Sequence, residues 1–286
     1  MVQIPEPQPA AYAAEPMGFY TDTTVCIGCK ACEVACKEWN GLPASDYDEV
    51  GTYTLSGNSY DNTGELSGTQ WRHVKFIEDF PNEDRSQGRW LMMSDVCKHC
   101  VQAACLEACP TGAIIRTEFD SVVIQADVCN GCRYCISACP FDVIGINEVT
   151  NTAMKCTLCY DRMQANMVPA CAQACPTASI QYGTVSELRQ RADTRVATLQ
   201  AQGTQAYIYG KEDVLGGLNS FYLLVDRPTV YGLPERPELP SRKVASNWLI
   251  GWGSAIVGGL VGALSLRKSR MDERTTEARD AEEVRR

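Results

Sequence analysis

The chain has little positive charge. Its 26 lysine and arginine residues are outnumbered by 35 aspartate and glutamate residues, which gives a net charge of -9. A protein that binds nucleic acid normally carries a basic patch that neutralises phosphates. The charge balance therefore argues against a nucleic-acid partner.

Motifs of catalysis are also lacking. The sequence has no phosphate-binding glycine loop, no nucleophile beside a base and no paired acid and base. The opening stretch "MVQIPEPQPAAYAAEP" has neither a basic nor an apolar region, so we expect no signal peptide. The composition is near that of globular proteins, and 286 residues can bury a sizeable core.

Cysteine, by contrast, is abundant. The 16 cysteines fall into four groups of four. Group I contains Cys26, Cys29, Cys32 and Cys36; group II contains Cys97, Cys100, Cys105 and Cys109; group III contains Cys129, Cys132, Cys135 and Cys139; group IV contains Cys156, Cys159, Cys171 and Cys175. Disulfides join distant segments and rarely gather thiols three residues apart, so a disulfide framework is disfavoured.

The spacing within the groups is typical of iron–sulfur proteins. Groups I and III have the run C-x2-C-x2-C-x3-C of bacterial ferredoxins, and a proline follows the last cysteine of groups II, III and IV. Three thiolates of one tight loop can reach three irons of a cubane cluster, while backbone N–H groups point at its sulfides. In two-cluster ferredoxins the fourth cysteine of each run ligates the other cluster.

The linking segments indicate which groups exchange their fourth cysteine. Residues 112–118 and 121–126 read as two strands between groups II and III, which is the layout of one two-cluster ferredoxin domain. Groups I and IV are left to pair around it. We therefore expect four [4Fe–4S] clusters. Set I is Cys26, Cys29, Cys32 and Cys175; set II is Cys97, Cys100, Cys105 and Cys139; set III is Cys129, Cys132, Cys135 and Cys109; set IV is Cys156, Cys159, Cys171 and Cys36.

Zinc is the alternative metal. Group IV alone, with a C-x2-C pair and a distant second pair, can be read as a zinc site. A closed tetrahedral zinc site gains nothing from the longer runs, so iron–sulfur is favoured. Two other side chains are candidates for tuning a cluster. His99 lies inside the group II loop, and Lys155 precedes Cys156, where its charge would raise a potential. An ordinary polar role for His99 and a solvated Lys155 are the alternatives.

Residues 244–266 carry no charge over 23 positions. A helix of this length, at about 1.5 Å per residue, spans the hydrocarbon core of a bilayer. Small residues recur every four positions, as at Ser254, Gly258 and Gly262, which suits packing on another membrane helix. A buried core helix is the alternative, but glycine is costly in a soluble helix.

The charges around this segment predict its orientation. Seven lysines and arginines follow it, and four lie in the eighteen residues before it. The positive-inside rule then places the tail 267–286 in the cytoplasm and the cysteine domain on the outer, periplasmic side.

These patterns predict an α+β fold. It consists of two interlocked ferredoxin-like dicluster halves with a polar insertion and a C-terminal transmembrane helix. A helix is predicted over 186–203, with Ser186 as N-cap. The expected division is an extended lead-in over 1–18, a four-cluster domain over 19–226 with its insertion at about 40–95, a proline-rich linker over 227–243, the helix over 244–266 and the tail over 267–286.

The motifs resemble those of a known family. "CIGCKACEVACKEWN", "CKHCVQAACLEACPTGAI", "CNGCRYCISACPFDV" and "KCTLCYDRM" are similar to the four-cluster iron–sulfur (beta) subunits of molybdopterin oxidoreductases. The stretch "VYGLPERPELP" and the following span most resemble membrane-bound formate dehydrogenase. In the nitrate reductase relatives a tryptophan occupies the place of Cys132, so the intact Cys132 disfavours that branch.

The resemblance, over about residues 18–266, implies a non-catalytic electron-transfer subunit. Electrons from formate would pass from a catalytic partner with a molybdenum or tungsten pterin centre, through four [4Fe–4S] clusters, to an integral membrane subunit of cytochrome b or other quinone-reactive type. Export on a twin-arginine signal of the catalytic partner would account for the lack of a signal peptide. The runner-up is the same role in a polysulfide, thiosulfate or dimethyl sulfoxide reductase, and a zinc-stapled membrane scaffold is a remoter alternative.

Overall fold

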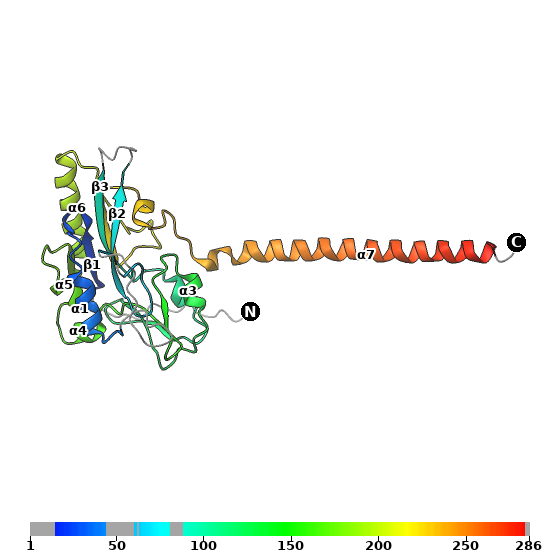
Figure 1. Cartoon of the computed structure of the whole chain (residues 1–286), viewed down its shortest axis with the longest axis horizontal. Coiled ribbons are helices and arrows are strands. Elements are labelled where there is room, and N and C mark those ends of the chain that lie inside the picture. Colours follow the sequence, from blue (N-terminus) through cyan, green and yellow to red (C-terminus); the bar gives the residue numbers. More distant parts are fainter. Residues whose placement is uncertain (1–14, 44–59, 62, 81–87, 284–286) are drawn as a thin grey trace, which may run out of the picture. The chain divides into compact units, whose positions relative to one another are not determined.

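The computed structural model describes residues 15–43, 60–61, 63–80 and 88–283. The chain divides into two compact units, of which the first ends at Leu239 and the second begins at Pro240. In the first unit, short helices and strands alternate with the cysteine loops (Figure 1). Helix and strand are both present, as the predicted α+β class requires.

A four-stranded sheet joins the start of the first unit to its end. Its order is β8 (Ile180–Thr184), β1 (Met17–Asp22), β10 (Ser220–Leu224) and β9 (Tyr207–Tyr209). Strand β1 runs antiparallel to β8 and parallel to β10. Group I follows β1 and group IV precedes β8, so the antiparallel pair brings these two groups to the same end of the sheet. Strand β1 was not predicted, and it begins inside the expected lead-in.

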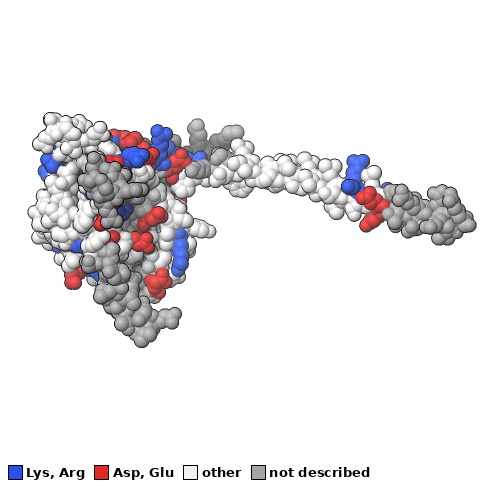
Figure 2. All heavy atoms as spheres, turned by 45° about the horizontal axis from the view of Figure 1, so that its top comes forward, with Lys and Arg blue, Asp and Glu red and all other residues white. Residues whose placement is uncertain are grey.

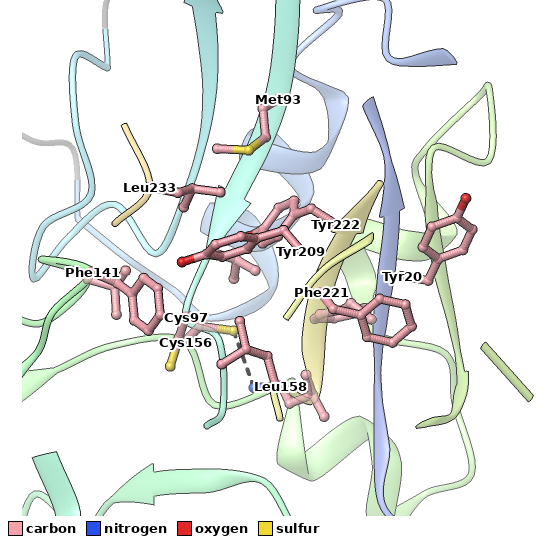
Figure 3. Packing of buried hydrophobic residues seen from close by; sticks show 14 of the residues in the cluster. Tyr20, Met93, Cys97, Phe141, Cys156, Leu158, Tyr209, Phe221, Tyr222 and Leu233 are labelled. Carbon is pink, nitrogen blue, oxygen red and sulfur yellow. Dashed lines mark hydrogen bonds between the residues drawn. The ribbon is translucent and has the colours of Figure 1, made fainter. Parts of the chain in front are cut away.

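Aromatic side chains form the centre of this sheet. Phe19, Tyr20, Phe221 and Tyr222 are almost completely buried, and the rings of Tyr20 and Phe221 stack at 5.6 Å (Figure 3). Aromatic residues contribute much of the apolar area that a core buries. All residues of β10 and all but the first of β1 are buried, so both faces of these strands belong to the core.

The predicted helix over 186–203 is confirmed as α6 (Val185–Ala201). Its buried side chains include Leu188, Ala192 and Leu199, and it packs on β1 and β8. The N-cap prediction was wrong. Thr184, not Ser186, caps the helix, because its side chain accepts a hydrogen bond from the N–H of Glu187. Thr184 ends β8, so the strand passes directly into the helix.

Three two-stranded hairpins complete the strands. They are β2 (Arg72–Asp79) with β3 (Arg89–Val96), β4 (Ile114–Arg116) with β5 (Val122–Ile124), and β6 (Gly145–Asn147) with β7 (Thr152–Met154). The strands predicted over 112–118 and 121–126 are confirmed as β4 and β5, with shorter bounds. Within the insertion expected at about 40–95, residues 44–59, 62 and 81–87 lie outside the described residues, and the part of 60–70 that the structure describes contains no helix or strand.

Short helices hold the cysteines. They are α1 (Ala31–Trp39), α2 (Ala104–Glu107), α3 (Tyr134–Ala138), α4 (Tyr160–Gln164) and α5 (Ala170–Gln173). Helix α1 packs against α5, and α2 packs against α3. In Figure 1, α1, α4 and α5 gather in one region of the first unit and α3 lies away from them. Group I is therefore near group IV, and group II is near group III.

The segment expected to be a linker is instead part of the first unit as far as Leu239. Tyr231, Leu233 and Leu239 are buried, and the hydroxyl of Tyr209 donates to the carbonyl of Pro234 at 2.6 Å. Two short 3-10 turns, η2 (Pro228–Tyr231) and η3 (Pro240–Lys243), lie in this region, and η1 (Thr23–Val25) lies after β1. The segment packs on the first unit because these apolar side chains lie between its prolines and are buried.

The second unit is dominated by the helix α7 (Val244–Glu283), which continues through most of the expected tail. Its stretch from Asn247 to Arg274 is long and apolar enough to span a membrane, with a mean hydropathy of 1.8, and none of it is buried. The alternative of a buried core helix is therefore wrong. Figure 2 shows a length of this helix without charge, followed by clustered basic and acidic side chains.

Candidate iron–sulfur sites

All four cysteine groups share one backbone feature. The residue two places after the first cysteine has a positive φ in every group: Gly28 at 67°, His99 at 43°, Gly131 at 70° and Leu158 at 62°. A left-handed residue in a tight loop turns successive N–H groups toward the same side, which creates a concavity for an anion. The loops are thus shaped to surround a negatively charged group.

Backbone donors already reach cysteine sulfurs in these loops. The N–H of Leu158 donates to Sγ of Cys156 at 3.3 Å (Figure 3), and the N–H of Ala153 donates to Sγ of Cys129 at 3.4 Å. Such donors stabilise a thiolate and lower the charge felt by a bound cluster.

The thiols of set I line one pocket. Cys26, Cys29 and Cys32 come from the loop after β1 and from α1, whereas Cys175 comes from the segment before β8. Burial raises the pKa of Cys26, and the nearby thiols of Cys175 and Cys29 raise it further. The antiparallel pairing of β1 with β8 is what brings Cys175 to the group I loop.

The thiols of set IV meet through helix packing. Burial raises the pKa of Cys36 well above its usual range, and the thiols of Cys156, Cys171 and Cys159 act in the same direction. Cys36 lies in α1 and Cys171 in α5, the two helices in contact. All four members of set IV are buried, which holds for none of the other three sets.

Sets II and III are brought together by α2 and α3. Burial raises the pKa of Cys100 well above its usual range, and the thiols of Cys97, Cys139 and Cys105 add to the effect. Burial likewise raises the pKa of Cys135 to about 11, and its neighbouring thiols are Cys129, Cys132 and Cys109. In each set, one neighbour comes from the other group.

The sets also lie in a definite sequence. Beside the effect of burial, thiols of neighbouring sets raise one another's pKa. The thiol of Cys171 in set IV raises the pKa of Cys32 in set I. In the same way, Cys97 in set II raises the pKa of Cys156 in set IV, and Cys135 in set III raises the pKa of Cys105 in set II. Figure 3 shows Cys97 and Cys156 together. The order that follows is I–IV–II–III.

The two exposed cysteines are Cys29 in set I and Cys132 in set III, which lie at the two ends of this order. Set IV is thus enclosed by protein, set II is partly buried, and each terminal set has one exposed cysteine.

The donors suit an iron–sulfur cluster. All sixteen cysteines are free thiols, and among the described residues no three cysteine, histidine or carboxylate side chains are arranged around a single ion. Thiolates spread around a shared pocket are the donors that a cubane requires. Because burial and crowding raise the pKa of Cys105 and Cys156 to about 12, cluster binding must displace protons from neutral thiols.

The two candidate tuning residues are both buried. The Nδ1 atom of His99 accepts from the N–H of Val122 at 3.0 Å, and burial together with the charge of Lys155 holds the pKa of His99 well below its usual range. Lys155 is 2% exposed, so the alternative of a solvated lysine is wrong. Its ammonium donates to the carbonyls of Val122 and Cys156.

Arg72 is a residue that sequence reasoning missed. It is 1% exposed, and its Nη1 atom donates to Oγ of Ser94 at 3.0 Å. Ser94 in turn lies 3.2 Å from Sγ of Cys32. The only signal in the sequence was a basic residue opening a strand of alternating pattern, and that pattern places most such residues at the surface.

Comparisons with known proteins agree with these sites. Two families, each described as a 4Fe-4S dicluster domain, match residues 25–113 and 88–185. The nitrate-inducible formate dehydrogenase iron–sulfur subunit of Escherichia coli K12 is 41% identical over 240 residues, which is 82% of this chain and 78% of that protein. The formate dehydrogenase-O iron–sulfur subunit of the same strain is 40% identical over 240 residues, 82% of this chain and 76% of that protein.

A third relative is more distant. The B subunit of the anaerobic dimethyl sulfoxide reductase of Haemophilus influenzae is 33% identical over 189 residues, which is 64% of this chain and 81% of that protein. With 16 cysteines and two dicluster matches, the chain provides for four [4Fe–4S] clusters, and the zinc scaffold is set aside.

The left-handed loop residues generate a prediction. Gly131→Ala should lower cluster content, because a Cβ there would lie 2.3 Å from the carbonyl oxygen of Asn151 and alanine is strained at its φ of +70°. Gly112→Ala is the matched control, since Gly112 has the same φ of +70° but no atom within 4 Å of an added Cβ. Iron and sulfide content per chain is the measurement. Equal losses in both variants would contradict a role for the close approach to Asn151.

Proposed function

The chain belongs to the family of formate dehydrogenase iron–sulfur subunits, and on this basis we propose that it carries electrons from a formate-oxidising catalytic subunit to the membrane. The observation that carries the proposal is the row of four cysteine sets in the order I–IV–II–III, with one exposed cysteine at each end. Electrons enter at one terminal set and leave at the other.

We assign the ligands as sets I to IV, with Cys175, Cys139, Cys109 and Cys36 as the cysteines exchanged between groups. The pocket shared by Cys26 and Cys175 and the neighbours of Cys36, Cys100 and Cys135 support this assignment. The same exchange makes two interlocked ferredoxin-like halves, one from groups I and IV and one from groups II and III. The contacts of α1 with α5 and of α2 with α3 support that division.

The protein's own residues perform the supporting chemistry. When bound, each [4Fe–4S] cluster supplies a site that takes up and releases one electron. The thiolates hold the clusters, the loop N–H groups point at sulfur, and the core excludes water from set IV. Since no acid–base pair is needed to move an electron, the lack of catalytic motifs agrees with this role.

The two ends of the row are suited to partners. Ile27 and Val34, near Cys29, and Val128 and Tyr134, near Cys132, are exposed apolar side chains. Exposed apolar surface next to a functional site is typical of an interface. We assign these ends to a catalytic subunit with a molybdenum or tungsten pterin centre and to an integral membrane subunit of cytochrome b or other quinone-reactive type. Helix α7 anchors the chain beside the second partner.

Ligand exchange predicts which variants share a phenotype. Cys139→Ser should alter the same electron paramagnetic resonance signal as Cys100→Ser, because both thiols belong to set II. It should leave intact the signal that Cys132→Ser alters, which belongs to set III. Spectra of the three reduced variants, with iron content, are the measurement. If Cys139→Ser matched Cys132→Ser instead, the exchange between groups II and III would be contradicted.

Formate is the expected electron source. Adding formate to the purified anaerobic complex should bleach the broad visible absorption of the clusters as fully as dithionite does. Dithionite serves as the control that the clusters are intact. If formate left the clusters oxidised while dimethyl sulfoxide reoxidised the dithionite-reduced complex, the proposed electron source would be overturned in favour of a dimethyl sulfoxide reductase role.

The orientation of α7 can be tested directly. Seven lysines and arginines follow the apolar segment, against four in the eighteen residues before it, and this bias places the C-terminal tail in the cytoplasm. In right-side-out sealed vesicles, protease should digest the cluster domain and spare the tail, and inside-out vesicles should give the reverse. Digestion of the tail in right-side-out vesicles would overturn the assigned topology.

A further inference from the structure

Three buried cations of the first unit, Arg72, Lys155 and Arg162, form no ion pair with a carboxylate among the described residues, and the first two lie between cysteine sets. Arg72 and Lys155 are 1% and 2% exposed. Buried Lys98, by contrast, is paired with Asp95. A buried charge is very costly unless another charge compensates it. Arg72 and Lys155 therefore require a partner that is neither aspartate nor glutamate.

Arg72 lies at the junction of sets I and IV. Through Ser94 its Nη1 atom connects to Cys32 of set I, by contacts of 3.0 Å and 3.2 Å. Burial by itself would lower the pKa of Arg72, but the thiols of Cys171 and Cys156 in set IV raise it. The Nε and Nη2 atoms are buried and have no hydrogen-bond partner. The guanidinium thus has free donors in the region between two cysteine sets.

Lys155 lies at the next junction, between sets IV and II. Its Nζ atom donates to the carbonyl of Cys156 at 3.1 Å, next to a set IV thiol. Its charge is within reach of Cys97 and Cys105 of set II. Set IV therefore has an uncompensated cation on each side along the order I–IV–II–III.

Set IV is also where a cation is most needed. A cluster held by four thiolates gains one negative charge on reduction, and burial disfavours that added charge. Set IV alone among the four has every cysteine buried. Without compensation, its cluster would be the hardest to reduce and would interrupt electron transfer between its neighbours.

We propose that Arg72 and Lys155 are positioning residues that offset the burial of the set IV cluster and keep it reducible as an interior step of the electron path. The inference rests on the proposed function and its ligand sets. Each step moves one electron, so one cluster is oxidised as the next is reduced. No bond forms or breaks and no proton is transferred, and formate oxidation in the catalytic partner supplies the electrons.

The test is a potentiometric titration of the purified complex, monitored by electron paramagnetic resonance. Arg72→Gln should shift the signals of sets I and IV to lower potential, by about tenfold in the reduction equilibrium, or about 59 mV for one electron. Lys155→Gln should shift those of sets IV and II. The set IV signal should be the one that moves in both variants, and the set III signal should move in neither.

Two further variants separate charge from structure. Arg72→Lys keeps the charge and should restore most of the potential. Arg162→Gln removes another buried arginine, three residues after Cys159, whose guanidinium lies over the ring of Trp39 and donates to the carbonyl of Val168. The printed hydrogen bonds of Arg162 go to Val168 and Gln173 and not to a cysteine sulfur, so this variant should leave all four potentials unchanged.

The outcomes distinguish the two proposals. Full iron content with unshifted potentials in Arg72→Gln, or an equal shift of all four signals, would overturn this inference alone. If Arg72→Gln failed to assemble its clusters, the potentials of Lys155→Gln would be used instead. Unshifted potentials at full iron content, or an equal shift of all four signals, would overturn the inference there too. Wild-type complex without four clusters, or with clusters that formate does not reduce, would overturn the proposed function instead.

Discussion

The constraint on which this structure depends is the concentration of negative charge in a protein interior. Four clusters with sixteen thiolate ligands must lie close enough for electrons to pass between them, yet each thiolate resists burial. The first unit meets this with left-handed loop residues that turn N–H groups toward sulfur, and with buried Arg72 and Lys155 at the junctions.

The second organising feature is contact between distant segments. Strand β1 opens the first unit, β8 follows group IV, and their antiparallel pairing sets group I beside Cys175. Helices α1 and α5 pack against each other, which brings Cys36 of α1 close to Cys171 of α5. The proposed ligand sets would couple cluster binding to tertiary folding, because each set draws thiols from two loops. The aromatic sheet behind groups I and IV gives that half a rigid base.

The structural features that were predicted correctly depend on residues close together in the sequence. The runs of cysteines, the strand patterns of β4 and β5, the apolar face of α6 and the apolar length of α7 are all periodic or closely spaced signals. The misses were of another kind. Thr184 caps α6 because β8 ends there, residues 227–239 pack on the sheet despite their prolines, and Arg72 is buried although its strand looked ordinary. In each case a partner distant in sequence decided the outcome.

By itself, the sequence determined the kind of chemistry, because thiols three residues apart can wrap a cluster whatever surrounds them. It also determined that one helix is apolar enough for a membrane, since that depends only on composition and length. Only the tertiary structure decided the order of the cysteine sets, which of them is fully enclosed, and which cations stand between them. Those properties depend on distances and burial between segments far apart in the chain, and no local spacing encodes them.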